Sequence, residues 1–249
     1  MKRIPSLPPV RRALVLAAGN GDRFLSASRG SKLLQPVFGR PLILRTLTTA
    51  MEAGISSFEI VLGYQADSLR AAIDASLPHA DIHFSYNPEW RLENGLSVLA
   101  ARDRLETSSF ALLMGDHVFE ADALSRLLHN PKQPDDSVLA IDTRPAPDHV
   151  VDEATKVELD GSRIVAIGKD LEPFDALDTG MFLCSPTLFD ALVESQRQGD
   201  TTLSGGTRQL AAQGLMHGLD VGGAEWYDID TMEDLEAAAL RLSSPPGSA

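Results

Sequence analysis

The sequence predicts an α/β protein built on a mostly parallel mixed sheet, and three observations support this. Short apolar segments alternate with segments of helical spacing through the first half of the 249 residues. The first of these, 13–17, is apolar throughout, as in parallel sheets that are covered on both faces. It runs directly into Gly19-Asn20-Gly21, at the carboxyl end of a strand, where such sheets bind ligands. We expect a single domain over residues 1–249 with its ligand site along that edge.

In the first half of the sequence, expected strands alternate with expected helices. Helical spacing in 41–53 ends at Gly54, a residue typical of helix carboxyl ends. The other segments follow in regular order, and together they indicate βαβ units. We expect strands at 13–17, 58–63, 82–86 and 110–114, and helices at 41–53, 66–75 and 96–105.

The second half contains more strands and fewer helices. Asp160-Gly161 between two apolar runs predicts a β-hairpin. We interpret these segments as an insertion that completes an acceptor pocket beside the first half. The expected strands are 137–142, 155–159, 164–167 and 179–184, the expected helices are 186–195 and 232–242, and 1–11 and 243–249 are expected to be flexible tails.

Composition excludes several classes of protein. A net charge of −13 argues against a nucleic-acid surface, which needs a basic face. Cys184 is the single cysteine, so neither an internal disulfide nor a cysteine-based metal cluster can form, and its apolar setting predicts an inert core residue. No apolar run approaches the ~18 residues of a membrane span, and the proline-rich start lacks the apolar run of a signal peptide. We expect a cytoplasmic protein without direct membrane insertion.

The turn after the first strand has the chemistry of a triphosphate site. Two glycines allow backbone N–H groups to approach phosphate oxygens, and Arg23 and Lys32 add positive charge. The spacing excludes a P-loop, because no Gly-x-x-x-x-Gly-Lys-Ser/Thr string occurs. It also excludes the dinucleotide fingerprint, whose third glycine is replaced by Phe24.

Carboxylates near both ends of the chain point to a metal ion. Asp116 follows the strand 110–114 and a glycine, so it emerges at the ligand edge of the sheet. Asp228 and Asp230 are two residues apart and share a face if that segment is extended. Mg²⁺ binds one or two carboxylates together with substrate phosphates, so Asp116 with Asp228 or Asp230 would suit it. The alternatives are a turn or cap role for Asp116, and capping of the helix 232–242 by Asp230.

A family resemblance strengthens this interpretation. The strings Leu16-Ala17-Ala18-Gly19-x-Gly21-x-Arg23-Phe24 and Lys32-x-Leu34-x-Pro36-Val37-x-Gly39-Arg40-Pro41-Leu42 resemble the signature of the sugar-phosphate nucleotidylyltransferases. Within that superfamily the chain is most similar to the CTP:inositol-1-phosphate cytidylyltransferases. The strings that carry this are Asn94-Gly95-x-Ser97, 114–120, Glu153-Ala154-Thr155-Lys156-Val157, 167–171 and 174–180.

The resemblance implies a fold and a set of roles. The fold is a Rossmann-like three-layer sandwich of the nucleotide-diphospho-sugar transferase type, and Mg²⁺ would bind Asp116 with Asp228 or Asp230. Lys32 and Arg23 would neutralise CTP and its departing pyrophosphate, and Lys169 would contact the acceptor phosphate. Other implied contacts are Leu16, Ala17, Ala18, Gly19, Asn20 and Gly21 with the nucleotide, Asn94, Gly95 and Ser97 near its base, and Asp178, Thr179 and Gly180 along the acceptor hydroxyls.

The implied reaction transfers CMP from CTP to inositol 1-phosphate. A phosphate monoester is already a competent nucleophile near neutral pH, so no general base is required and we interpret His117 as a structural histidine. Two alternatives remain: the same chemistry on another phosphorylated acceptor, such as phosphocholine or a sugar 1-phosphate, or with another nucleotide, and a nucleotide-binding regulator without activity. Phosphocholine normally needs an aromatic cage, and only 6% of this chain is aromatic. The sequence gives no indication of an oligomeric state.

Overall fold

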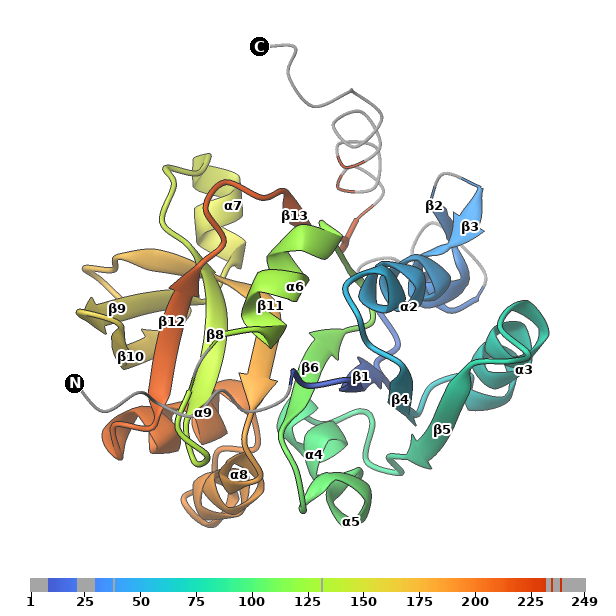
Figure 1. Cartoon of the computed structure of the whole chain (residues 1–249), viewed down its shortest axis with the longest axis horizontal. Coiled ribbons are helices and arrows are strands. Elements are labelled where there is room, and N and C mark those ends of the chain that lie inside the picture. Colours follow the sequence, from blue (N-terminus) through green and yellow to red (C-terminus); the bar gives the residue numbers. More distant parts are fainter. Residues whose placement is uncertain are drawn as a thin grey trace.

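One nine-stranded sheet runs through both halves of the chain (Figure 1). The computed structural model describes residues 9–21, 30–37, 39–130, 132–231, 234 and 238. The strand order is β5-β4-β1-β6-β11-β8-β12-β10-β9, and β11 also pairs with β9. The strands are β1 Arg12–Ala17, β4 Ser57–Leu62, β5 Asp81–Tyr86, β6 Phe110–Met114, β8 Ser137–Asp142, β9 Lys156–Asp160, β10 Arg163–Gly168, β11 Ala176–Cys184 and β12 Met216–Asp220.

Helices cover both faces of this sheet. Alternate residues of β1 enter different cores: Val15 packs with α2, α3 and α6, whereas Leu14 packs with α4, α5, α8 and α9. This arrangement is a three-layer sandwich, as expected. The helices are α2 Leu42–Glu52, α3 Ala66–Ser76, α4 Asn94–Leu99, α5 Arg102–Leu105, α6 Ala121–Leu128, α7 Asp148–Glu153, α8 Thr187–Arg197 and α9 Leu203–Ala212.

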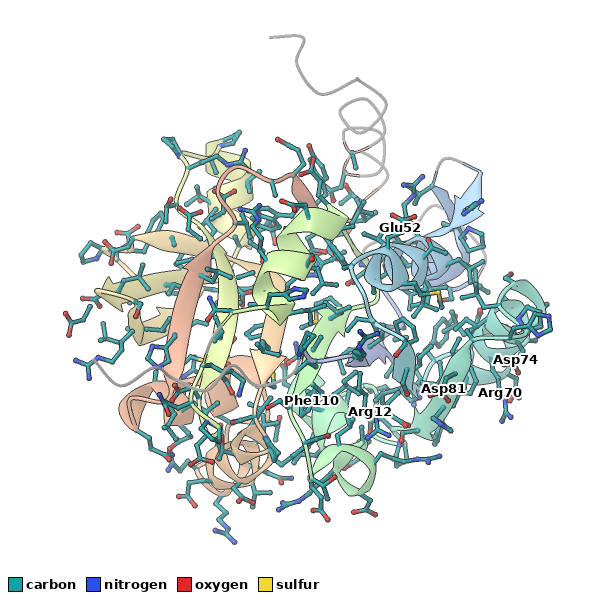
Figure 2. The ribbon with its side chains drawn as sticks, viewed as in Figure 1. Arg12, Glu52, Arg70, Asp74, Asp81 and Phe110 are labelled. Atoms are coloured by element: carbon teal, nitrogen blue, oxygen red, sulfur yellow. The ribbon has the colours of Figure 1, made fainter. Side chains whose placement is uncertain are left out.

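The side chains follow the same division between interior and surface. Phe110 of β6 is fully buried, and its ring stacks on Phe189 of α8 with centroids 5.5 Å apart. Arg70 and Asp74 lie on the outer side of α3, where they form an exposed ion pair (Figure 2). Within the described residues no helix combines the length and the apolar character needed to cross a membrane.

The direction of β11 brings the second half to the ligand edge. The four strands β5-β4-β1-β6 are parallel, and β11 then runs antiparallel to β6, with Met181 opposite Leu113. The amino-terminal part of β11 therefore lies beside the carboxyl end of β6, where Asp116 emerges. The second half, expected to complete a pocket, thus borders the parallel strands of the first half.

Most expected elements are present, and the differences concern several helices and one strand of the large sheet. The helix expected over 96–105 is two short helices, α4 and α5, with a break at residues 100–101. Helices α6, α7 and α9 and strand β12 were not among the expected elements, although Leu124, Leu127 and Leu128 of α6 have helical spacing. Of the expected helix 232–242 only residues 234 and 238 are described, and both are helical. Residues 1–8 of the expected tail 1–11 and the expected tail 243–249 lie outside the described residues, whereas the Arg11 carbonyl accepts from the Ser56 and Ser57 N–H groups.

Candidate active site

The carboxyl end of β1 is held between its two neighbours. The Gly115 N–H donates to the Leu16 carbonyl and the Tyr64 N–H donates to the Ala18 carbonyl, both at 2.9 Å. Gly115 is required there, because a Cβ would lie 2.7 Å from the Leu16 oxygen. A Cβ on Gly19 would meet no described atom within 4 Å, so the backbone of Gly19 has open space beside it.

Lys32 connects this turn to two carboxylates. It belongs to the short 3₁₀ helix η1 Lys32–Leu34, whose start is capped by the Ser31 hydroxyl. A Cβ on Gly21 would lie 3.0 Å from the Lys32 Cβ, so the glycine turn packs on the lysine stem. The Lys32 side chain is only 6% exposed, and its Nζ lies 2.7 Å from Asp116 Oδ2 and 2.8 Å from Asp230 Oδ1.

These ion pairs fix the charges of the cluster. Burial alone would lower the pKa of Lys32, but attraction from Asp116 and Asp230 raises it well above its usual value. Burial alone would raise the pKa of Asp116, but the Lys32 ammonium and His117 hold it below its usual value. Lys32 and Asp116 therefore carry opposite full charges near neutral pH.

Asp228 reaches the same place from a small separate sheet. Strand β13 Trp226–Asp228 pairs antiparallel with β7 His117–Phe119, so Asp228 lies opposite His117. The His117 Nε2 is 3.5 Å from Asp228 Oδ2, and the Ile229 N–H donates to the Asp116 carbonyl at 3.2 Å. The segment 226–228 is extended, and this strand ends at Asp228, two residues before Asp230.

The donor set fits a divalent cation. Single ligand atoms of Asp116, His117 and Asp228 all lie within 4.8 Å of one another. Burial, together with repulsion from Asp116 and Asp230, raises the pKa of Asp228 to about 6 against the attraction of His117. Among the described residues, the carboxylates of Asp116, Asp228 and Asp230 gather around the single ammonium of Lys32, an excess of negative charge that a divalent cation would neutralise. Carboxylate oxygens are the ligands that Mg²⁺ prefers.

His117 packs against the backbone of β11. Its Nδ1 is buried and has no hydrogen-bond partner among the described residues. Gly180, with φ +76°, lies directly beneath the ring, and a Cβ there would be 2.4 Å from that Nδ1. The Gly180 N–H donates to Asp178 Oδ1 at 2.7 Å, and burial raises the pKa of Asp178 to about 6 in spite of this bond.

We expect Gly180→Ala to destabilise the protein and to displace the His117 ring. A left-handed φ costs a non-glycine residue about 1–2 kcal/mol, and the collision with His117 adds about 1–3 kcal/mol of overpacking. Gly161→Ala is the matched control, because Gly161 also has a positive φ, +64°, but a Cβ there meets nothing within 4 Å. Urea unfolding should give the larger loss for Gly180→Ala; equal losses in the two variants would contradict the close approach of His117.

Lys169 leaves β10 at the same edge as Asp178. Lys156 of β9 pairs with Gly168 of β10 on one side and with Leu177 of β11 on the other. These three residues lie side by side across the strands, and the next residues in the same direction are Lys169, directly after β10, and Asp178 of β11. The Lys156 side chain is buried and donates to the Lys169 carbonyl, which holds this turn. The exposed Lys169 side chain is thus attached to a fixed backbone.

The other residues singled out by the sequence make contacts within the protein. Asn94 Oδ1 accepts from the Leu203 N–H at 2.8 Å, and a Cβ on Gly95 would lie 2.4 Å from the Thr201 carbonyl, so both connect α4 to α9. The Ser97 hydroxyl accepts from the Asn87 side chain at 2.9 Å. The buried Thr179 hydroxyl donates to the Ala140 carbonyl at 2.8 Å. Their roles toward ligands stay predictions, and Arg23 lies outside the described residues.

Comparison with known proteins decides the family. Residues 13–159 match the MobA-like NTP transferase domain. The chain belongs to this family.

Two curated proteins are similar to this MobA-like NTP transferase over most of its length. Both are named bifunctional IPC transferase and DIPP synthase. The protein from Rubrobacter xylanophilus is 36% identical over 90% of this chain, and the protein from Aquifex aeolicus is 31% identical over 94%. The chain covers 50% and 52% of these proteins, so it spans about half the length of the curated relatives it matches.

Solved structures confirm the fold of this MobA-like NTP transferase. The inositol-1-phosphate CTP transferase from T. maritima superposes with a TM-score of 0.84 at 24% identity. The superposition includes 94% of this chain and 95% of the T. maritima chain. At 24% sequence identity, this structural similarity establishes a shared fold alone. The expected Rossmann-like sandwich of the nucleotide-diphospho-sugar transferase type is confirmed.

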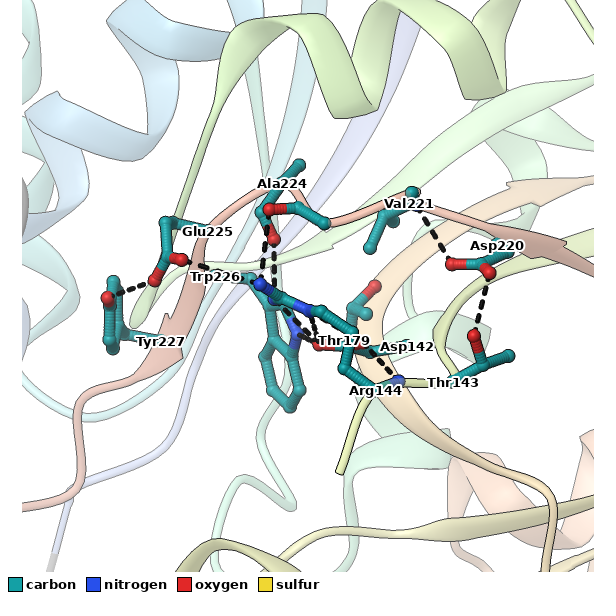
Figure 3. Close-up of polar contacts among 12 residues, drawn as sticks. Asp142, Thr143, Arg144, Thr179, Asp220, Val221, Ala224, Glu225, Trp226 and Tyr227 are labelled. Atoms are coloured by element: carbon teal, nitrogen blue, oxygen red, sulfur yellow. Dashed lines mark hydrogen bonds and ion pairs between the residues drawn. The ribbon is translucent and has the colours of Figure 1, made fainter. Parts of the chain in front are cut away.

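A polar network that the sequence did not reveal lies behind β13 in this MobA-like NTP transferase (Figure 3). Asp142, the last residue of β8, binds the Arg144 guanidinium and accepts from Trp226 Nε1 at 2.9 Å. Burial would raise the pKa of Asp142, but the hydrogen bonds from Arg144 and Trp226 hold it below its usual value. The sequence around Asp142 and Arg144 does not predict this network, because the residues they bind lie about 80 positions further along the chain.

Cys184 has no part in this site. It is the last residue of β11 and is 1% exposed. Burial raises the pKa of its thiol far above the usual value, so it carries no thiolate near neutral pH. The prediction of an inert core cysteine is confirmed.

Proposed function

We propose that this protein transfers CMP from CTP to inositol 1-phosphate and releases pyrophosphate, in a Mg²⁺-dependent reaction. Membership of the NTP transferase family, the names of the curated relatives and the fold of the T. maritima enzyme support this function. The single observation that carries it is the position of Lys32 between Asp116 and Asp230, beside the glycine turn of β1, with Asp228 close to Asp116. A triphosphate and a divalent cation require this combination.

The proposed chemistry is one in-line displacement at the α-phosphorus of CTP. A phosphate oxygen of the acceptor forms a new P–O bond to this phosphorus while the bond to the bridging oxygen of the β-phosphate breaks. The electron pair of that bond leaves with pyrophosphate, so atoms and charges balance. Because both reactants are anions, the protein contributes mainly by positioning them and by neutralising charge.

The residues around the glycine turn would act on the nucleotide. The open backbone at Gly19 would donate N–H groups to phosphate oxygens. Lys32 would neutralise charge on the triphosphate and on pyrophosphate, and Arg23, named on resemblance alone, would assist it. No residue needs to remove a proton from the acceptor, which fits the enclosed position of His117 against Gly180.

Asp116 and Asp228 would hold Mg²⁺, while Asp230 holds the Lys32 ammonium. When bound, the cation would withdraw charge from the α-phosphate. The hydrogen bond from Ile229 to the Asp116 carbonyl keeps the two segments that carry these carboxylates together. Of the two candidates left open by the sequence, the geometry favours Asp228 over Asp230 as the second metal ligand.

The acceptor would bind beside β11. Lys169 would contact its phosphate, and the half-buried Asp178 and the backbone near Gly180 would lie along its hydroxyl groups. A carboxyl group whose pKa is about 6 can accept a hydrogen bond from a hydroxyl near neutral pH, when it is largely ionised. Such contacts would distinguish a polyhydroxylated acceptor from phosphocholine.

The test is a matrix of CTP, UTP, GTP and ATP against inositol 1-phosphate, phosphocholine and glucose 1-phosphate, with pyrophosphate release measured. We expect release with CTP and inositol 1-phosphate to exceed every other pair by at least about tenfold. Release with another pair alone would overturn the substrates and keep the reaction. CTP binding without release from any pair would favour a nucleotide-binding regulator.

A further inference from the structure

The segment between β12 and β13 needs a restraint beyond the bond that the Gly222 N–H donates to Asp220 Oδ1 at 2.8 Å. It includes Gly222 and Gly223, whose φ values are +62° and +91°. Two successive glycines allow many backbone conformations when nothing holds them. Strand β13 begins directly afterwards at Trp226, so the path of this segment decides where Asp228 lies.

Arg144 supplies that restraint. Its Nη1 donates to the Gly223 carbonyl at 3.1 Å and its Nη2 donates to the Ala224 carbonyl at 3.0 Å. The same Nη1 lies 3.5 Å from the Glu225 carboxylate (Figure 3). One planar guanidinium thus binds three successive residues, and its fork of donors fixes their relative positions in a way that a lysine ammonium does not.

Asp142 anchors the guanidinium to the sheet. The Arg144 Nε donates to Asp142 Oδ1 at 3.1 Å, and Nη2 donates to Asp142 Oδ2 at 2.9 Å. The same Oδ2 accepts from Trp226 Nε1 at 2.9 Å. Since Asp142 ends the buried strand β8, both the glycine segment and the first residue of β13 are tied to the centre of the fold.

We propose that Arg144 is a positioning residue for the divalent-cation site, and that the clamp Asp142–Arg144–Trp226 sets the Asp228 carboxylate against Asp116. Arg144 acts through the backbone, because its contacts end at residue 225 and Asp228 lies three residues further on. From Trp226 onward the β7 pairing carries the position to Asp228, opposite His117. The role of the cation in catalysis rests on the proposed function; the clamp itself concerns cation binding.

The first test measures cation binding without substrates. Mn²⁺ is titrated into wild-type protein and Arg144→Met, and free Mn²⁺ is followed by electron paramagnetic resonance. We expect the Kd for Mn²⁺ to rise about tenfold in Arg144→Met, the effect typical of losing groups that orient metal ligands. Hydrogen exchange of the amides in 224–230 should become faster in the same variant.

Arg102→Met is the matched control. The Arg102 and Arg144 side chains are 37% and 42% exposed, and Arg102 also makes two ion pairs, with Asp190 and Glu106. It lies on α5, at the opposite end of the molecule from β13 (Figure 1). We expect Arg102→Met to leave the Mn²⁺ Kd and the exchange of 224–230 unchanged.

Two further variants separate positioning from general stability. Trp226→Phe keeps an aromatic ring and every charge but removes the donor to Asp142, so it should raise the Mn²⁺ Kd in the same direction by a smaller factor. Arg144→Lys should restore the Kd only in part. In the enzyme assay, the Mg²⁺ concentration for half-maximal rate should rise in Arg144→Met while kcat at saturating Mg²⁺ stays within about threefold of wild type.

Each result of these experiments either supports or overturns the positioning role of Arg144. A wild-type Mn²⁺ Kd in Arg144→Met, even with a lowered Tm, would overturn it and leave Arg144 a structural residue. If Arg144→Met does not fold, an unchanged Mn²⁺ Kd in Trp226→Phe would overturn it equally. If wild-type protein fails to convert CTP and inositol 1-phosphate, the proposed function falls, and the Mn²⁺ and exchange measurements still test the clamp.

Discussion

Replacing Lys32 with alanine should lower kcat by about 10²–10³-fold, the loss that follows removal of one preorganised group that stabilises developing charge. In the wild-type protein the buried ammonium lies within 2.8 Å of Asp116 and Asp230, and it would be the described cation nearest the departing pyrophosphate. The measurement is steady-state pyrophosphate release at saturating CTP, acceptor and Mg²⁺. Arg23→Ala should have an effect of the same order.

Lys132→Ala is the matched control for Lys32→Ala. Lys132 is also buried, 8% exposed against 5% for Lys32, and its ammonium binds backbone carbonyls, the shortest contact being 2.8 Å to Asp136. It should lower stability and leave kcat near the wild-type value. Near-wild-type kcat in Lys32→Ala, or an equal loss in both variants, would contradict the catalytic role of Lys32.

Lys32→Ala should also lower the stability of the protein, because Asp116 and Asp230 would then repel each other without the ammonium between them. Removing one partner of a buried ion pair costs about 3–5 kcal/mol, and the cost here should lie at the lower end because the Asp116 and Asp230 side chains are 30% and 33% exposed. Mg²⁺ should therefore raise the Tm of the variant more than the Tm of wild type. This comparison separates lost stability from lost chemistry.

Asp116→Asn should lower kcat by at least about 10²-fold, because it removes a charged oxygen ligand and one partner of Lys32 at the same time. The amide keeps the size of the side chain, so the fold should persist. The measurement is the dependence of pyrophosphate release on Mg²⁺, which should shift to higher concentrations. Mn²⁺ binding should weaken in parallel.

Asp160→Asn provides the comparison for Asp116→Asn. Asp160 lies in an exposed hairpin with Arg163 3.2 Å away, and such surface pairs contribute little. Both kcat and the Mg²⁺ dependence should stay at wild-type values. A wild-type Mg²⁺ dependence in Asp116→Asn would remove Asp116 from the metal site.

The sequence predicts the parallel half of the sheet well because local patterns dominate there. The strand expected at 110–114 matches β6, and the residues after it place Asp116 at the ligand edge, as expected. The break between α4 and α5 at residues 100–101 has no glycine or proline to indicate it. Val98, Ala101 and Leu105 have the spacing of a continuous helix and all enter the same core, so the apolar pattern predicts one helix across the break.

The sequence predicts which residues belong to the candidate site better than it predicts which of them contact one another. Apolar strands and glycine turns identified Lys32 and Asp116 as neighbours of one edge, but the partner choice of Asp228 and Asp230 depends on the β13–β7 pairing. Arg144 could not be found, because an arginine on a loop has no sequence pattern that reports contacts with residues 223–225. Such long-range polar contacts need coordinates.

The bond between Lys32 and Asp230 joins residues 198 positions apart, so the centre closes only when these two distant segments meet. During synthesis the ribosome delivers Lys32 long before Asp230. Of the two described ion-pair partners of Lys32, Asp116 alone is present until then, and Asp228 is also still to be synthesised. Closing so large a loop is entropically costly and makes the centre a late event in folding. Unfinished chains can therefore form much of the sheet while remaining unable to assemble the complete cation site.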